Sequence, residues 1–327
     1  MEQYVSNGEP VGSKSVCEDL DMLFSSATIR NEMAKLAENG YLTQPHISAG
    51  RVPSHQGYRL YINRLMPKKL LSLQEIDDIN SVLKLNLADP EQLLDSAAKI
   101  LSTITNCIAI VTTPPADESR VRDIQFVLIG RRSAMLVLMT SDGRVKNKLF
   151  RCKYDLNADI LHMFTEILNS KFRGERLKDI TPEFVSILVD NDRELAFLLL
   201  PVIDVLIQTA KEAQEIEVKI HGQKNLLQIS EISAEDVVNV FSFLEEKDNI
   251  VELLTLSDYG MKFVVGSENR YIQLKNSSVI STHYNIGNKF GTIGIIGPTR
   301  MDYSKVSAQL QYVASLVGVM LGRTLEN

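Results

Sequence analysis

Cysteine is scarce in this sequence, and the few cysteines stand far apart. Cys17, Cys107 and Cys152 are the three that it holds, and none forms the Cys-x-x-Cys spacing of a zinc or redox motif. The pattern excludes a disulfide framework and favours a reduced, cytoplasmic setting, in which each cysteine serves as a small buried apolar residue. The five histidines are scattered too, without a histidine or cysteine partner at metal-ligand spacing. We therefore expect no metal site.

Long apolar runs and a cationic leader are also absent. The longest apolar run, LAFLLLPVIDVLI from Leu195, is too short to cross a bilayer and contains Pro201 and Asp204. No signal peptide opens the chain. Apolar residues make up 44% of the sequence and charged residues 23%, which is ordinary for a globular protein. The sequence therefore predicts a soluble protein with no membrane partner.

Catalytic signatures are missing as well. The sequence has no Gly-x-x-x-x-Gly-Lys phosphate loop, no dinucleotide fingerprint and no Gly-x-Ser-x-Gly nucleophile elbow. The stretch GTIGIIG spaces Gly291, Gly294 and Gly297, but it has the pattern of a strand, and close strand packing explains these glycines better than phosphate binding. We therefore do not expect an enzyme.

The chain is acidic as a whole but basic near its N-terminus. Its formal net charge of -6 argues against a uniform coat on nucleic acid or on an anionic membrane. From residue 22 to residue 69, seven cationic side chains stand against two carboxylates, which gives this segment a charge of +5. A basic patch on an acidic protein confines phosphate binding to one face. The cations are Arg30, Lys35, Arg51, Arg59, Arg64, Lys68 and Lys69, and the carboxylates are Glu32 and Glu38.

Residues 1–66 have the pattern of two helices, a short hairpin and a third helix. The second helix is expected to begin at Ser25 or Ser26, because serine is a favoured N-cap, and to end at Gly40. The third helix is expected to open at Ser54. The apolar stripe of the second helix is Ile29, Met33 and Leu36, and the third helix carries Tyr58, Tyr61, Ile62 and Leu65.

The N-terminal half of the second helix has the composition of a base-reading surface. Reading bases in the major groove needs a helix with small or polar residues at its N-terminal end. Arg30 suits guanine or phosphate, and Asn31 suits adenine. An ordinary solvated helix face stays open as the alternative for Asn31 and Lys35, and Thr28 has packing as its alternative. The polar positions at this end are Ser25, Ser26, Thr28, Arg30 and Asn31.

The loop of the hairpin is a candidate wing. A short strand at Tyr41–Leu42 is expected to pair with residues around Val52, and His46–Pro53 is the loop between them. Ser48, Ala49 and Gly50 make a tip of little bulk that can approach a sugar-phosphate backbone or a minor groove, where Arg51 would contact phosphate or enter the groove. An ordinary hairpin with a surface arginine remains the alternative.

The rest of the chain alternates between helical and strand patterns. Residues 67–105 are expected to be a helical connector, and residues 106–152 and 230–327 have the pattern of strands closed by a final helix. The stretch YIQLK is one of the expected strands, Asp302 is the expected cap of the final helix, and the apolar stripe of that helix is Val306, Leu310, Val313 and Val317. Residues 153–229, mostly helical, lie between them. The helix that contains Leu198 is apolar over most of its circumference, so it must be buried in its own domain or against a partner chain. The simplest layout is a sheet domain split by an inserted piece.

Several of these stretches are similar to one known family. GEPVGSK, SSATIRNEMAKLAENGYL, QPHISAGRVPS and GYRLYI resemble the N-terminal region of HrcA, the bacterial heat-inducible transcription repressor. GTIGIIGPTRMDYSKV resembles the C-terminal signature of the same family. The similarity extends over essentially the whole chain, and both motifs are specific.

The resemblance implies an α+β multidomain protein. Its parts would be an N-terminal winged helix-turn-helix, a GAF-like α/β domain, and an inserted α+β dimerising domain. It implies a homodimer that binds an inverted-repeat operator, the CIRCE element, and represses chaperone operons until heat shock. It also implies that a GroEL-type chaperonin keeps the repressor competent. The GAF-like domain of this family is not known for a defined small ligand, so no cofactor is expected.

The resemblance also assigns DNA-contacting positions and reveals one departure. In the family a full first helix precedes the YVSNGEPVGSK motif, whereas only three residues precede that motif here, so we expect exposed apolar side chains and weaker DNA binding from a chain of this length. The positions carried over are Ser26, Thr28, Arg30, Asn31 and Lys35 in the recognition helix, Gln44, His46, Ser48, Gly50 and Arg51 in the wing, and Lys14 as a phosphate contact.

Two functions of other classes compete with the repressor. A small-molecule-sensing transcription factor would bind its ligand in the GAF-like domain, and a stabilising metabolite in a thermal-shift screen would favour it. A pure interaction module would use the winged helix to bind protein, and affinity that barely varies with salt would favour that function.

Overall fold

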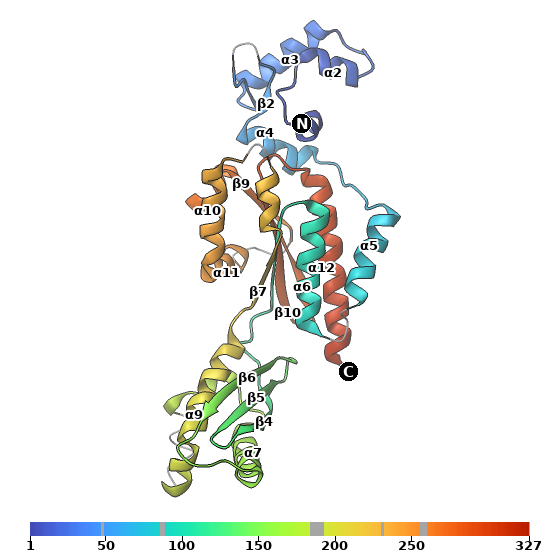
Figure 1. Ribbon diagram of the computed structural model, residues 1–327. Helices are drawn as coiled ribbons and strands as arrows, with labels where there is room; N and C mark the ends of the chain where they lie inside the picture. Colours follow the sequence, from blue (N-terminus) through green and yellow to red (C-terminus); the bar gives the residue numbers. More distant parts are fainter. Residues whose placement is uncertain (47–48, 86–88, 184–192, 230–231, 256–259, 327) are drawn as a thin grey trace. The chain divides into compact units, whose positions relative to one another are not determined.

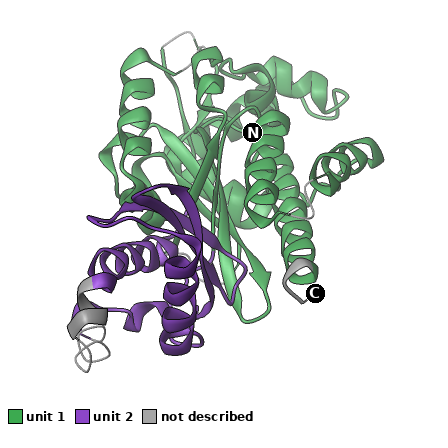
Figure 2. Ribbon diagram, turned by 60° about the horizontal axis from the view of Figure 1, so that its bottom comes forward, with its two compact units in different colours: residues 1–113, 218–324 green, residues 114–217, 325–327 purple. Residues whose placement is uncertain are grey.

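The computed structural model describes residues 1–46, 49–85, 89–183, 193–229, 232–255 and 260–326 (Figure 1). Helices and sheets are mixed throughout, which confirms the α+β class. The chain forms two compact units (Figure 2). The first unit holds residues 1–113 and 218–324, and the second is built from residues 114–217, with 325–327 grouped to it.

The N-terminal segment, residues 1–66 of the first unit, contains the two helices, the hairpin and the third helix that the sequence predicts, and a short helix that it does not predict, α1, precedes them. Ser25 caps α3 by accepting a hydrogen bond from the Thr28 amide, and Ser54 caps α4 through the Gly57 amide. Gly40 follows α3 with a φ of 79°, a conformation that glycine adopts without strain. The elements are α1 (Glu2–Asn7), α2 (Ser13–Asp19), α3 (Ser26–Glu38), β1 (Leu42–Thr43), β2 (Val52–Pro53), α4 (His55–Leu60) and the π-helical turn η1 (Tyr61–Leu65).

The rest of the first unit, called the sheet region below, is an antiparallel five-stranded sheet with helices on both faces (Figure 1). Ala109 and Val111 point to one face and Ile108 and Ile110 to the other, because successive strand residues alternate. The sheet order is β7 (Val218–His221), β3 (Ile108–Thr112), β10 (Lys289–Pro298), β9 (Ser277–Ile286) and β8 (Lys262–Val265). The first face packs on α6 (Pro90–Thr105) and α12 (Tyr303–Glu326), with α5 (Leu73–Lys84) beyond α6, and the second on α10 (Ala234–Glu245) and α11 (Lys247–Thr255).

The glycines of β10 serve close packing, as predicted. A Cβ atom at Gly291 would lie 2.3 Å from the Tyr284 ring, and one at Gly297 would lie 2.6 Å from the Cys107 sulfur. Asp302 caps the closing helix through the Lys305 amide, also as predicted. The predicted stripe of that helix is buried at Val306, Leu310, Val313 and Val317.

The second unit is a three-stranded antiparallel sheet with helices packed on it (Figure 2). Its strands are β4 (Val121–Gly130), β5 (Ser133–Thr140) and β6 (Val145–Arg151), in that order, and its long helices are α7 (Ala158–Phe172) and α9 (Arg193–Gln214). The apolar helix α9 buries Val202, Leu206 and Ala210 within this unit. The sheet of the same unit therefore covers these side chains, and their burial does not require a partner chain. The second unit also has a short helical turn at Leu177–Asp179, and the short helical turns of the first unit are Gln223–Gln228, Gly266–Glu268 and Ile272–Leu274.

The structure corrects the expected division of the chain. The sequence pattern places residues 106–152 in the sheet domain, but the strands within 114–152 pair with one another in the second unit. It places residues 153–229 in the insert, but β7, within 218–229, pairs with β3 of the sheet region. Strand pairing joins residues that are distant in sequence, so local patterns place a strand without telling which sheet receives it.

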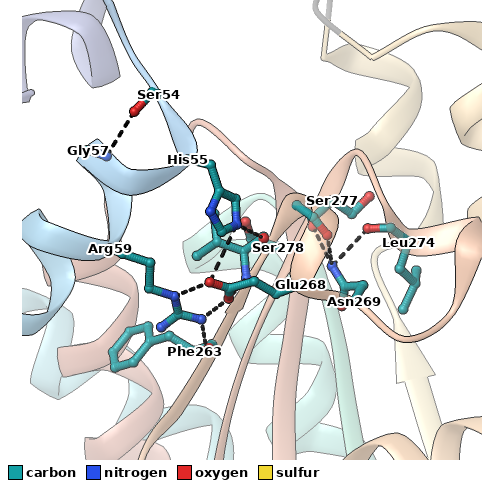
Figure 3. A network of polar contacts seen from close by, with 12 residues as sticks. Ser54, His55, Gly57, Arg59, Phe263, Glu268, Asn269, Leu274, Ser277 and Ser278 are labelled. Carbon is teal, nitrogen blue, oxygen red and sulfur yellow. Dashed lines mark hydrogen bonds and ion pairs between the residues drawn. The ribbon is translucent and has the colours of Figure 1, made fainter. Parts of the chain in front are cut away.

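Two further expectations are corrected. The helix α6 is a layer of the sheet region and not a connector within 67–105, because Leu93, Ala97 and Leu101 are buried against β3 and its neighbours. The stretch YIQLK was expected to be a strand and is a helical turn instead. The buried Asn269 amide donates hydrogen bonds to the Leu274 and Ser277 carbonyls and so folds this stretch into a loop (Figure 3).

Candidate DNA-binding surface

The start of α3 is built by short polar side chains. The Ser25 hydroxyl lies 2.9 Å from the Thr28 hydroxyl and accepts a hydrogen bond from the Thr28 amide. The Ser26 hydroxyl lies 3.1 Å from that of Ser13, so it ties the first residue of α3 to the first residue of α2. Ser26 is half-buried and Thr28 is exposed. Both predicted contact residues thus already have structural partners in the protein.

Three predicted contact residues are left open to solvent. Lys14 on α2 and Arg30 and Asn31 on α3 are exposed, and their side chains make no hydrogen bond or ion pair within the described residues. Lys35 is different, since its ammonium lies 2.7 Å from a Glu32 carboxylate oxygen. That hydrogen bond and charge raise the pKa of Lys35 and offset part of its positive charge. Arg30 and Asn31 are therefore the groups on α3 most available to an external partner.

The hairpin positions its arginine through one glutamine. The Gln44 amide donates a hydrogen bond to the Ala49 carbonyl at 3.0 Å and accepts one from the Arg51 guanidinium at 2.5 Å. Gln44 spans the loop in this way and holds Arg51 from the opposite strand. Arg51 is half-buried, while Gln44 and His46 are exposed. Ser48, another predicted wing residue, lies outside the described residues.

Gly50 has a structural task that the sequence did not indicate. The backbone of Arg51 pairs with that of Val11, donating to it at 2.8 Å and accepting from it at 2.9 Å. A Cβ atom at Gly50 would lie 2.4 Å from the Val11 carbonyl oxygen, which is far inside normal contact. The glycine is therefore required by the segment before α2, independently of any approach to a nucleic acid backbone.

The N-terminal segment has little core of its own. Among the described residues before Tyr58, Ile29 is the one buried side chain, while Met33 is half-buried and Leu36 is 41% exposed. In the turn between α2 and α3, Leu23 is 75% exposed and Phe24 is 55% exposed. Backbone pairing and caps must therefore carry much of the stability of this segment.

Helix α4 and the turn η1 after it attach the N-terminal segment to the sheet region. Tyr58, Tyr61 and Ile62 are buried in the same cluster as α6 and α12. On the polar side, Arg59 pairs with Glu268 and donates a hydrogen bond to the Phe263 carbonyl at 2.7 Å (Figure 3). Sequence reasoning counted Arg59 in the basic patch and missed this pairing, because its partner lies more than two hundred residues away.

The described residues offer neither a metal cluster nor a helix suited to a membrane. No group of three or more histidine, cysteine, aspartate or glutamate side chains there is arranged to hold a metal ion. None of the helices in that part of the chain has the length and apolar character that a membrane span requires. Cys107 and Cys152 are buried and Cys17 is half-buried, and all three are free thiols.

Known proteins resemble the chain in sequence and in fold. The family described as "HrcA protein C terminal domain" matches residues 91–306. The "Heat-inducible transcription repressor HrcA" of Alkaliphilus metalliredigens is 35% identical, over 98% of this chain and 94% of its own length. The repressor of the same name from Brevibacillus brevis is 33% identical, over 100% and 96%. A crystal structure of a protein described as hypothetical matches 99% of this chain, with a TM-score of 0.69 and 23% identity, and it shows a shared fold.

These similarities place the molecule among bacterial transcription repressors, and not among enzymes. Its family follows directly from the extent of the match. The chain belongs to the HrcA family of heat-inducible transcription repressors.

Proposed function

We propose that two copies of this chain bind an inverted-repeat operator, the CIRCE element, and repress chaperone operons until heat shock. In this proposal α2, α3 and the β1–β2 hairpin form a winged helix-turn-helix, with α3 in the major groove and the hairpin as its wing. The observation that carries it is the open polar face of α3, on which Arg30 and Asn31 have no partner within the described residues. The other contact residues proposed are Lys14, Ser26, Thr28, Lys35, Gln44, His46, Ser48, Gly50 and Arg51.

Gly50 and Gln44 enter this proposal with the roles that their contacts favour. Gly50 would let the hairpin pack on Val11, and Gln44 would hold Arg51 in place for a phosphate. Ser26 and Thr28 would set the start of α3 through their bonds to Ser13 and Ser25. The residues of this group that reach bases would then be few, which is usual for a single recognition helix.

We infer that the second unit joins the two copies, as an inserted dimerising domain. One face of its sheet packs on α7 and α9, and the opposite face is rich in apolar side chains. Val127 is 44% exposed, Val145 is 58% exposed and Leu149 is 64% exposed on that opposite face. A twofold axis through such a face lets the same apolar patch cover itself, and a symmetric dimer suits a symmetric operator. The apolar residues of the face are Val127, Met135, Val137, Met139, Val145 and Leu149.

The remaining parts of the proposal follow from family membership. The sheet region would be the GAF-like domain, and a GroEL-type chaperonin would keep the repressor competent. A ligand-sensing role has less support, since apolar clusters cover both faces of the sheet. A cavity of about 460 Å³ lies beside α1 and the start of α12, where Lys69 and Arg300 line it.

A gel shift tests the proposed function directly. Purified protein should retain an inverted-repeat operator and bind a scrambled duplex much more weakly, with chaperonin raising the active fraction. Replacing Arg30 with alanine should cost about 1 to 3 kcal/mol of operator binding, because a bidentate base contact is lost. The control is Arg64→Ala, which removes an exposed cation outside the proposed surface. Equal retention of operator and scrambled duplex would refute the proposal.

A further inference from the structure

The joint between the N-terminal segment and the sheet region is a compact polar cluster. It consists of His55 and Arg59 on α4, and of the strand β8 with the turn that follows it (Figure 3). The Arg59 guanidinium bonds both oxygens of the Glu268 carboxylate and also reaches the Phe263 carbonyl at 2.7 Å. The His55 Nε2 atom lies 2.9 Å from the Val265 carbonyl and 3.4 Å from a Glu268 oxygen. The joint is therefore fixed by several directional contacts and not by one.

Glu268 is itself held in place. Its second oxygen accepts a hydrogen bond from the Val265 amide at 2.9 Å. The side chains of Arg59 and Glu268 are 29% and 25% exposed, so the pair is shielded from solvent more than an ordinary surface ion pair. Burial lowers the pKa of Arg59, although an arginine stays charged at any ordinary pH. An arginine bound in this way points its planar fork at the carboxylate and is not free to follow a DNA phosphate.

Resting on the proposed dimeric operator binding, we propose that Arg59 and Glu268 are a positioning pair that selects the spacing between operator half-sites. A dimer that reads two half-sites must hold its two recognition helices at a set separation. Every loose joint between them broadens the range of separations that the protein tolerates. The α4 helix follows the hairpin with only Ser54 between them, so fixing α4 on β8 removes one such joint.

Neighbouring contacts make this pair suitable for substitution. Tyr58 packs edge-on against Tyr303, with 5.9 Å between ring centroids, and the Lys69 ammonium lies 2.7 Å from Asp302. Neither contact involves Arg59 or Glu268, so both should survive replacement of the pair. We therefore expect such variants to stay folded with a looser joint, and circular dichroism with a thermal melt would verify the fold.

The experiment compares spacing and half-site affinity for the intact protein and its variants. Glu268→Gln keeps the size of the side chain and removes its charge, Arg59→Ala removes the fork, and Arg64→Ala is the charge-matched control. Each protein is titrated at one salt concentration with a single half-site and with inverted repeats whose half-sites are moved apart by one base pair at a time. The wild type and Arg64→Ala should prefer one spacing. Glu268→Gln and Arg59→Ala should reduce that preference by about fivefold or more, with unchanged single half-site affinity.

The outcomes separate this inference from the proposed function. If the variants bind the operator but keep the wild-type preference, or if the wild type binds all spacings equally, the positioning role is wrong and operator binding stands. If Arg59→Ala weakens single half-site binding and lowers its salt slope by about one, Arg59 is a phosphate contact and the positioning role is also wrong. If the wild type ignores every inverted repeat, the proposed function fails first, and the inference fails with it.

Discussion

The N-terminal segment and the sheet region belong to one compact unit but are stabilised in different ways. In the sheet region, side chains such as Leu310, Val313 and Ile110 are fully buried between a sheet and its helices. In the N-terminal segment before Tyr58, Ile29 alone is buried among the described residues, and the order comes from serine caps, the Val11–Arg51 backbone pairing and the docking of α4. A surface that binds a partner keeps its polar side chains exposed and therefore buries few apolar ones. The rigidity of the N-terminal segment thus depends on its docking to the sheet region.

The largest expected effect tests the core side of this comparison. Leu310→Ala leaves a void between α12 and the sheet, so we expect it to lower the free energy of unfolding by about 2 to 5 kcal/mol. Met33→Ala, the matched change on the half-buried stripe of α3, should cost much less, because part of that side chain is already in water. Urea unfolding followed by circular dichroism measures both. Similar losses in the free energy of unfolding for the two variants would contradict the proposed difference between the sheet region and the N-terminal segment.

A second substitution tests the backbone contacts of the N-terminal segment. Gly50→Ala would place a methyl group against the Val11 carbonyl, so the hairpin must move, at a cost of about 1 to 3 kcal/mol. Operator affinity should fall with stability, since the hairpin carries Arg51. Gly12→Ala is the control, because nothing lies within 4 Å of its added Cβ atom and its φ of -92° suits alanine. Equal changes in stability and operator affinity for the two variants would show that the hairpin accommodates the added methyl group at Gly50 without cost.

A third, smaller effect tests whether Gln44 acts through Arg51. Arg51→Ala should reduce the salt slope of operator binding by about one, as the loss of one phosphate contact requires. Gln44→Ala should weaken binding through the same contact, so adding it to Arg51→Ala should change little further. A double-mutant cycle from gel shifts at several salt concentrations gives the coupling. Fully additive losses would assign Gln44 a separate contact of its own.

The sequence predicted the local features of both regions and missed the long-range ones. Ser25, Gly40, Ser54 and Asp302 mark helix ends by chemistry confined to a few residues, and the structure confirms each of them. The partners of β3 are β7 and β10, both more than a hundred residues away, and no local pattern identifies them.

The same limit applies to the candidate surface. The sequence groups Arg59 with Arg30 as basic residues of one patch, but only the fold shows that Arg59 forms an ion pair with Glu268. Gly50 looked like a tip of little bulk, and its crowding against Val11 depends on a segment outside the hairpin. A residue type thus indicates what a side chain can do, and the distant partner decides whether it is free to do so.

The smallest predicted effect concerns a cap beside the core, where caps should matter less than in the N-terminal segment. At the start of α5, the amide and hydroxyl of Ser72 donate hydrogen bonds to Glu75 and lower its pKa from 4.5 to about 2. Because the folded pKa lies below the unfolded one, this stabilisation is complete above pH 4.5 and disappears as the pH falls toward 2. The advantage of the wild type over Glu75→Gln in unfolding experiments should therefore be small at neutral pH and shrink across that window. A constant difference down to pH 2 would mean that the carboxylate charge contributes nothing, and that the cap stabilises α5 by shape alone.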